Sequence, residues 1–132
     1  MLPANLRLRA EAHVNDLAER YHIRVRRSKE WATSEAELTT RQVFIPRQIR
    51  NGIDYLAALH EIGHIVDPAA RQRDVRAAAV TGRRAEYEKL LNEAAAWAWA
   101  VKNARPSILE AFTKTDWRRM GHCWAGYAGP VW

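Results

Sequence analysis

The spacing of apolar residues predicts one helix at the start of the chain and a small sheet after it. In residues 5–21, apolar positions are three or four residues apart and polar residues stand between them, as on an amphipathic helix. In residues 22–27, two apolar residues alternate with basic ones, which indicates a short half-buried strand. Further strands are expected over residues 29–33 and 38–45, and the second stops at Pro46, as an edge strand does. We expect the three strands to form an antiparallel sheet.

Helical spacing returns after residue 50. Asn51 is a suitable N-cap, and Asp54 lies three residues later, where a carboxylate favours the positive end of the helix dipole. This helix should end near Val66, because Pro68 disfavours a helical residue before it. Three more helices are expected, over residues 71–81, 83–104 and 107–120. Residues 121–132 are rich in glycine, so they are expected to form an irregular tail.

Length and composition favour one α+β domain over residues 1–132. The chain has 132 residues, which suffice for one apolar core but not for two of ordinary size. A single cysteine excludes a disulfide-stapled scaffold and suits a reducing compartment, so we expect a cytoplasmic protein. The longest strictly apolar run, residues 94–101, is too short to span a hydrocarbon core of about 30 Å. We therefore expect no membrane partner.

The chain is basic, with a formal net charge of +6. Such a charge attracts nucleic acids and acidic proteins. The arginines are dispersed along the sequence, and no tract resembles a dedicated nucleic-acid arm. Charge alone therefore does not choose between a nucleic acid and a protein partner.

The residues with the clearest chemistry are in the segment H-E-I-G-H, residues 60–64. His60 and His64 are four apart on a predicted helix, so their side chains project from nearly the same face. Both imidazoles can reach one metal ion at Zn–N distances of about 2.0–2.1 Å. Glu61 lies one step round the helix, where its carboxylate can take a proton from water activated by zinc. The segment predicts a zinc site with a general base beside it.

A catalytic zinc site usually has three protein ligands, so a third residue is needed. Glu93 is our prediction, because it lies among apolar residues of the helix predicted over 83–104, where a carboxylate without a partner would be costly to bury. Asp67, three residues after His64, is an alternative, either as a ligand or as a hydrogen-bond acceptor for a ligand imidazole. Glu86 is a second alternative, seven residues before Glu93.

These residues together resemble the ImmA/IrrE-type metallopeptidases, a gluzincin family. The resemblance rests on H-E-I-G-H, on Glu93, on the aromatic–alanine pair that begins at Trp97 and on the later Pro106, and it covers roughly residues 38–106. It implies a minimal zincin-like domain, zinc as cofactor, and a protein or peptide substrate such as a regulatory protein. It also implies that His60, His64 and Glu93 bind the metal and that Glu61 is the base. The arginine-rich residues 71–84 and the last 25 or so residues match nothing in it.

Other side chains are candidates for supporting roles. Carbonyl hydrolysis needs a donor for the developing oxyanion, and His122 and Tyr127 in the glycine-rich tail could fold over the site. Asn92, beside the predicted third ligand, is a candidate for the same role or for a contact with a ligand. Residues 42–45 could form an edge strand beside the metal cleft, to which an extended peptide adds as a further strand.

The sequence thus predicts a zinc-dependent metallopeptidase that hydrolyses a peptide bond in a protein. Two alternatives remain open. One is a non-catalytic module, stabilised by a metal, that binds DNA or a regulatory protein through its basic surface. The other is an accessory protein with a degenerate site.

Overall fold

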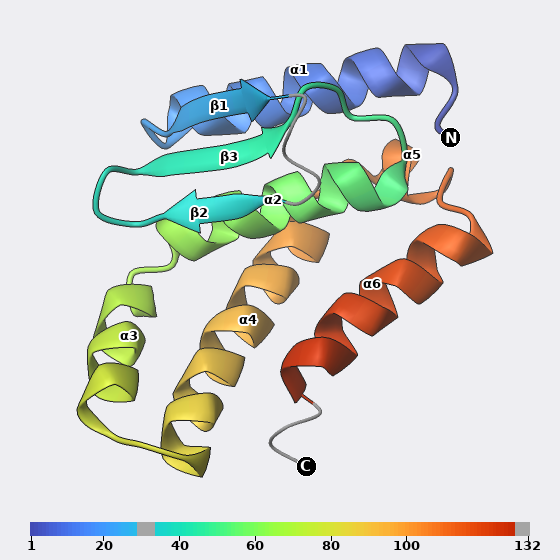
Figure 1. Ribbon diagram of the computed structural model, residues 1–132. Coiled ribbons are helices and arrows are strands. Elements are labelled where there is room, and N and C mark those ends of the chain that lie inside the picture. Colours follow the sequence, from blue (N-terminus) through green and yellow to red (C-terminus); the bar gives the residue numbers. More distant parts are fainter. Residues whose placement is uncertain (29–33, 129–132) are drawn as a thin grey trace.

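The structure, a computed structural model, describes residues 1–28 and 34–128, and of residues 123–128 only the backbone. The described part of the chain is an α+β fold with a three-stranded sheet and six helices (Figure 1). Its elements are α1 (Ala4–Arg20), β1 (Arg24–Ser28), β2 (Glu35–Glu37), β3 (Gln42–Pro46), α2 (Gly52–Val66), α3 (Ala70–Ala79), α4 (Arg83–Asn103), α5 (Pro106–Leu109) and α6 (Lys114–Ala128). No helix in this part of the chain has the length and apolar character needed to cross a membrane.

The sheet is mixed, so the antiparallel prediction is wrong. Its strand order is β1-β3-β2, with β1 parallel to β3 and β2 antiparallel to β3. β2 and β3 form an antiparallel hairpin. β3 lies between β1 and β2 and runs in the same direction as β1. The strand predicted over residues 38–45 starts only at Gln42, after a turn in which Arg41 has a φ of 53°. The strand predicted over residues 29–33 lies outside the described residues, and β2 was not predicted.

The prediction of β3 as an edge strand is also wrong, because β3 is the central strand. Val43 and Ile45 on this strand are fully buried. Pro46 occupies the last pairing position, opposite Ser28, where the missing N–H of proline interrupts little of the ladder. The edge strand on the α2 side is β2.

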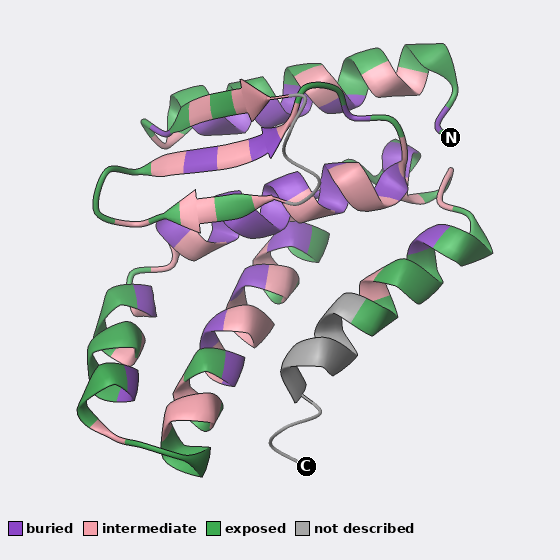
Figure 2. Cartoon of the chain, viewed as in Figure 1, coloured by how far each residue is buried: buried purple, intermediate pink, exposed green. Residues whose placement is uncertain are grey.

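The core lies around α2, which is buried along most of its length. In Figure 1, α1 lies above the sheet, and α4 approaches α2 from the side away from the sheet. Figure 2 shows the buried residues of α1, β3 and α2 facing one another across this interior. The largest fully buried side chains belong mainly to β3 and α2; among them are Ile45, Tyr55, Leu56, Leu59 and Ile62. Most of the surface of α2 is thus covered by the core.

Both predicted ends of α2 are confirmed. The side chain of Asn51 accepts a hydrogen bond from the backbone N–H of Asp54 at 2.9 Å, as an N-cap does. At the other end Asp67 leaves the helical conformation with φ −65° and ψ 114°, directly before Pro68. The helices predicted over 71–81 and 83–104 are confirmed as α3 and α4. Gly82 between them has a φ of 64°, which favours glycine at that turn.

The C-terminal part differs from its prediction in two ways. The helix predicted over 107–120 is broken into α5 and α6, because Thr113 and Asp116 cap the start of α6 reciprocally. The N–H of Thr113 donates to the Asp116 carboxylate at 2.9 Å, and the N–H of Asp116 donates to Thr113 Oγ1 at 3.2 Å. The tail predicted to be irregular is helical up to Ala128. A single glycine such as Gly121 costs a helix only about 1 kcal/mol, which does not end it.

Candidate metal centre

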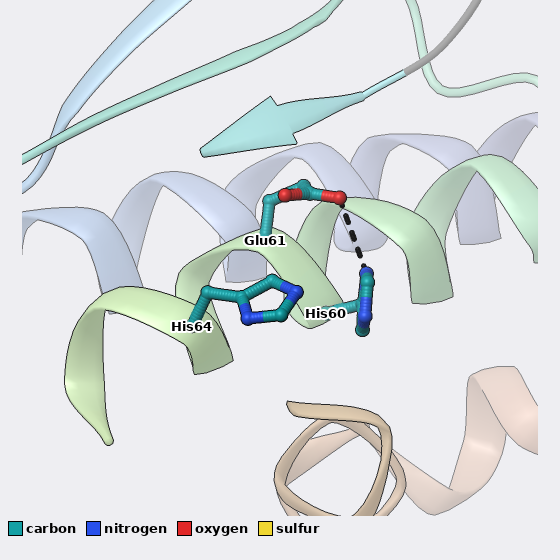
Figure 3. A group of neighbouring side chains, drawn as sticks. All are labelled: His60, Glu61 and His64. Carbon is teal, nitrogen blue, oxygen red and sulfur yellow. Dashed lines mark hydrogen bonds and ion pairs between the residues drawn. The ribbon is translucent and has the colours of Figure 1, made fainter. Parts of the chain in front are cut away.

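The two imidazoles of α2 lie together on one side of the helix. The ring centroids of His60 and His64 are 4.5 Å apart, and the ring planes meet at 70°. Figure 3 shows the two rings beside each other on the same helix, with Glu61 on the side of the helix that faces β2. The spacing of four residues therefore places the rings as the sequence predicts.

The carboxylate of Glu93 reaches both rings from α4. Its Oε2 lies 2.7 Å from Nε2 of His60, and its Oε1 lies 3.2 Å from Nε2 of His64. All three side chains are at least 86% buried, since their exposed fractions are 5%, 12% and 14%. Two helices that are far apart in sequence thus bring two imidazole nitrogens and one carboxylate to a single point.

A glycine allows α4 to approach α2 this closely. A Cβ atom added to Gly63 would lie 2.9 Å from the carbonyl oxygen of Ala96 and 3.3 Å from Cε3 of Trp99. Real Cβ atoms rarely come so near to backbone, so any other residue would separate the helices at this contact. The sequence reasoning did not assign a role to Gly63. The signal was available, because a glycine inside a helix usually has a packing reason.

Trp97, one turn after Glu93, stacks on the ring of His60. The ring centroids are 4.1 Å apart and the planes are within 18° of parallel. The stack restricts the orientation of the imidazole that Glu93 contacts. The sequence marked Trp97 only as part of a family resemblance and gave it no such contact.

The fourth side chain of the cluster is Glu61. Its Oε1 lies 3.1 Å from Nδ1 of His60, and the residue is 8% exposed. His60, Glu61 and His64 each offer a ligand atom within 4.8 Å of the others, so this group could hold a metal ion. Glu61 is therefore near enough to contact water or substrate at an ion held by the two imidazoles.

The carboxylates of Glu61 and Glu93 favour a positive charge beside the two imidazoles. Burial opposes a charge on His60, but hydrogen bonds with Glu61 and Glu93 raise its pKa to about 9. Burial likewise opposes the charge on Glu93, yet its hydrogen bonds with His60 and His64 lower its pKa to about 2. The carboxylates that favour a positive charge on His60 would also favour a metal cation at the same point. Two imidazole nitrogens and one carboxylate are also a donor set that zinc accepts, so the residues fit this metal.

A cavity of about 340 Å³ opens beside the cluster. Its walls come from β2, α2, α3 and α4, and they include Glu35, Glu61, His64 and Glu93. The strand that borders the cavity is β2, in place of the predicted residues 42–45. A peptide that adds to the sheet at this cavity would therefore pair with β2.

Asp67 and Asn92 hold helices together and do not contact the two imidazoles. The Asp67 carboxylate accepts hydrogen bonds from Arg73 and from the backbone N–H of Ala69. The Asn92 side chain donates to the carbonyl of Ala70 at 3.1 Å and accepts from Arg73 at 3.2 Å. This network joins the end of α2 and the start of α3 to α4, next to Glu93.

The remaining predicted residues lie away from the cluster. Glu86, the second alternative ligand, is 3.7 Å from Lys89 in an exposed ion pair. His122 is exposed on α6 and does not line the cavity. Tyr127 is in the part of α6 of which only the backbone is described. The prediction of an irregular tail is wrong for residues 121–128, which continue a helix, and residues 129–132 lie outside the described residues.

Comparison of the chain with family models, with curated proteins and with solved structures finds no match.

Proposed function

We propose that the chain is a zinc-dependent metallopeptidase with a minimal zincin-like fold, which acts on a protein or peptide substrate in the cytoplasm. The observation that supports it most is the meeting of Glu93 with both Nε2 atoms of His60 and His64. The sequence predicted this trio from spacing and from a family resemblance. An incidental glutamate on α4 has no reason to lie at the point where the two imidazoles converge.

His60 and His64 would hold zinc through Nε2, and Glu93 through its carboxylate. Bound there, zinc supplies Lewis-acid chemistry: it lowers the pKa of water towards neutrality and polarises a peptide carbonyl. Trp97 stacks on the His60 ring and restricts its orientation. Gly63 lets α4 lie close enough to α2 for Glu93 to reach both imidazoles.

Glu61 would act as the general base. Its carboxylate accepts the proton of the attacking water and can return it to the departing amine nitrogen. Its burial removes competing solvent and its place next to the cavity gives it access to substrate. Within residues 1–28 and 34–128, β2 is an edge strand beside the same cavity, and an extended peptide can hydrogen-bond to its outer backbone groups.

The test is a Glu61→Gln variant, assayed for zinc content and for hydrolysis of an unstructured protein such as casein. We expect a full complement of zinc and a loss of hydrolysis of about 10²–10⁴-fold, the usual effect of removing a general base. Glu86→Gln is the matched control, since it removes an exposed carboxylate of α4 and should change neither quantity.

Full activity in Glu61→Gln would remove Glu61 as the base. Zinc binding without hydrolysis in the unmodified protein would support the alternative of a metal-stabilised binding module. In that case, a DNA affinity that falls steeply with salt would identify the basic surface as the binding face.

A further inference from the structure

A second buried histidine borders a cavity that the proposed peptidase does not use. This cavity of about 280 Å³ lies between α1 and the start of α5. Arg9, His13 and Asp16 line it from α1, and Arg105 and Ser107 line it from the segment after α4. Its volume is close to the lower limit of small-ligand sites, about 300 Å³. We refer to it as the α1 pocket.

His13 presents one N–H to the α1 pocket. The residue is 6% exposed, and its Nδ1 lies 2.7 Å from the hydroxyl of Tyr55. That hydroxyl accepts the backbone N–H of Arg105 at 2.9 Å, and its own proton has no acceptor among the described residues other than His13, so we assign that proton to Nδ1 of His13. Nδ1 is then the acceptor, and the ring proton of neutral His13 is on Nε2.

Nε2 of His13 is open to a ligand. It makes no hydrogen bond with the described residues, and it is not one of the fully buried atoms without a partner. An atom that is neither paired nor enclosed must reach open space, and the cavity that His13 lines provides it. The imidazole is thus a rigid donor, fixed from behind by Tyr55.

The two arginines of the pocket are also free to bind. Neither guanidinium of Arg9 or Arg105 has an ion pair or hydrogen bond within the described part of the chain, although the chain has many carboxylates. Arg9 is four residues before His13 on α1, which places both on one helix face. Burial lowers the pKa of His13, and the charge of Arg105 lowers it further, while the charge of Asp16 opposes the fall. Two unpaired guanidinium groups against one carboxylate leave the lining of the pocket with an excess of positive charge. Such an excess favours an anion.

Asp16 narrows the choice of anion. Its carboxylate shares the pocket with the two arginines but pairs with no cation among the described residues. A carboxylate can only accept hydrogen bonds, so it repels an oxyanion that has lost all its protons. It accepts a hydrogen bond from a phosphoryl group that still carries an O–H.

We propose that the α1 pocket binds a phosphoryl group, through the guanidinium groups of Arg9 and Arg105 and the Nε2–H of His13, with Asp16 accepting the remaining phosphoryl proton. Arginine suits this ligand because its planar fork matches two phosphoryl oxygens. The source is either free phosphate or a phosphate monoester, and both present the same group to the pocket. The proposal is independent of the zinc site.

The experiment is an NMR titration of the full chain near pH 6 with inorganic phosphate, followed through the imidazole C–H signals of its five histidines. Histidine→Gln variants assign the signals. We expect phosphate to shift the His13 signal in a saturable way and to leave His22 and His122 unmoved. Shifts confined to His60 and His64, or a linear drift of all signals, would overturn the proposal.

A pair of arginine variants, one inside the pocket and one outside it, locates the site. Arg105→Gln should weaken phosphate binding by about tenfold, the usual effect of losing a charge-assisted hydrogen bond. Arg26→Gln, the same charge change at an exposed residue of β1 outside the pocket, should leave it within about twofold. Equal losses in both variants would show general charge attraction and would overturn the proposal.

Sulfate is the control ligand for phosphate, since it is also a tetrahedral oxyanion but carries no proton at this pH. We expect it to bind about tenfold more weakly than phosphate, and Asp16→Asn to abolish the difference. Sulfate binding as tight as phosphate in the unmodified protein would contradict the assignment. Methyl phosphate then separates the two sources: tighter binding than inorganic phosphate identifies a monoester, and weaker binding identifies free phosphate.

Discussion

The protein contains two buried histidine clusters with opposite charge preferences, and both involve α2. His60 is 4% exposed and contacts carboxylates through both ring nitrogens, so its pKa rises to about 9. His13 is 6% exposed; burial lowers its pKa and the charge of Arg105 lowers it further, against the opposing charge of Asp16. A low exposed fraction therefore does not by itself decide what a histidine can bind. The neighbours prepare one cluster for a cation and keep the other neutral.

The largest expected effect comes from separating the helices that form the cation cluster. Gly63→Ala places a Cβ against the backbone of Ala96, which must move α4 and with it Glu93. We expect the substitution to destabilise the fold by about 1–3 kcal/mol, as overpacking does. Zinc affinity should fall by more than the roughly 10–100-fold typical of residues that only orient ligands.

Gly121→Ala is the matched control for this substitution, because a Cβ at Gly121 meets nothing within 4 Å. This change should stabilise α6 by up to about 1 kcal/mol and leave zinc affinity unchanged. Urea unfolding and zinc titration measure both variants. Unchanged zinc affinity in Gly63→Ala would show that the α2–α4 contact does not position Glu93.

A smaller effect is expected from the ring that orients His60. Trp97→Leu removes the stack at 4.1 Å and should weaken zinc binding by about 10–100-fold. Trp97→Phe keeps an aromatic face and should recover most of the affinity. Trp117→Leu is the control, since Trp117 lies on α6, is 41% exposed and packs against Phe112 with a centroid distance of 5.0 Å. Equal losses at both tryptophans would indicate a general effect of tryptophan loss on the fold.

A further effect is a pH dependence of stability that differs between the two clusters in metal-free protein. Because the pKa of His60 is raised from 6.5 to about 9, its contribution to stability is complete below pH 6.5 and is lost as pH rises through 9. The pKa of His13 is lowered, so its contribution is present above pH 6.5 and is lost as pH falls below that value.

Urea unfolding in the presence of a chelator, at pH values from about 5 to 9.5, measures both contributions. Glu93→Gln should reduce the loss of unfolding free energy above pH 7. His13→Gln should reduce the loss of unfolding free energy between pH 6.5 and about pH 5. Stability that increases from pH 7 to 9 in the unmodified metal-free protein would contradict the charge assignment of His60.

The cluster of His60, His64 and Glu93 could be predicted from sequence because its geometry is mostly local. The four-residue spacing of His60 and His64 fixes their common face, and Asn51 and Pro68 fix the ends of the helix that carries them. Glu93 was predictable because a carboxylate amid apolar residues of a strong helix needs a partner. These inferences need only helical periodicity and the cost of burying charge.

What could not be predicted depends on contacts between distant segments. The direction of β1 relative to β3 follows from the order in which strands join the sheet, which alternation of apolar residues does not encode. The break before α6 was readable in principle from Thr113 and Asp116, but its capping geometry was overlooked. The α1 pocket depends on His13 meeting Tyr55, 42 residues away, and no local pattern indicates it.

The central claim, that Glu93 completes a zinc site with two imidazoles of α2, is tested most directly by zinc stoichiometry. Elemental analysis of purified Glu93→Ala beside Glu86→Ala compares two glutamates of the same helix, one in the cluster and one on the surface. We predict one zinc per chain in the unmodified protein and in Glu86→Ala, and a near-complete loss in Glu93→Ala. Unchanged zinc content in Glu93→Ala would contradict the account.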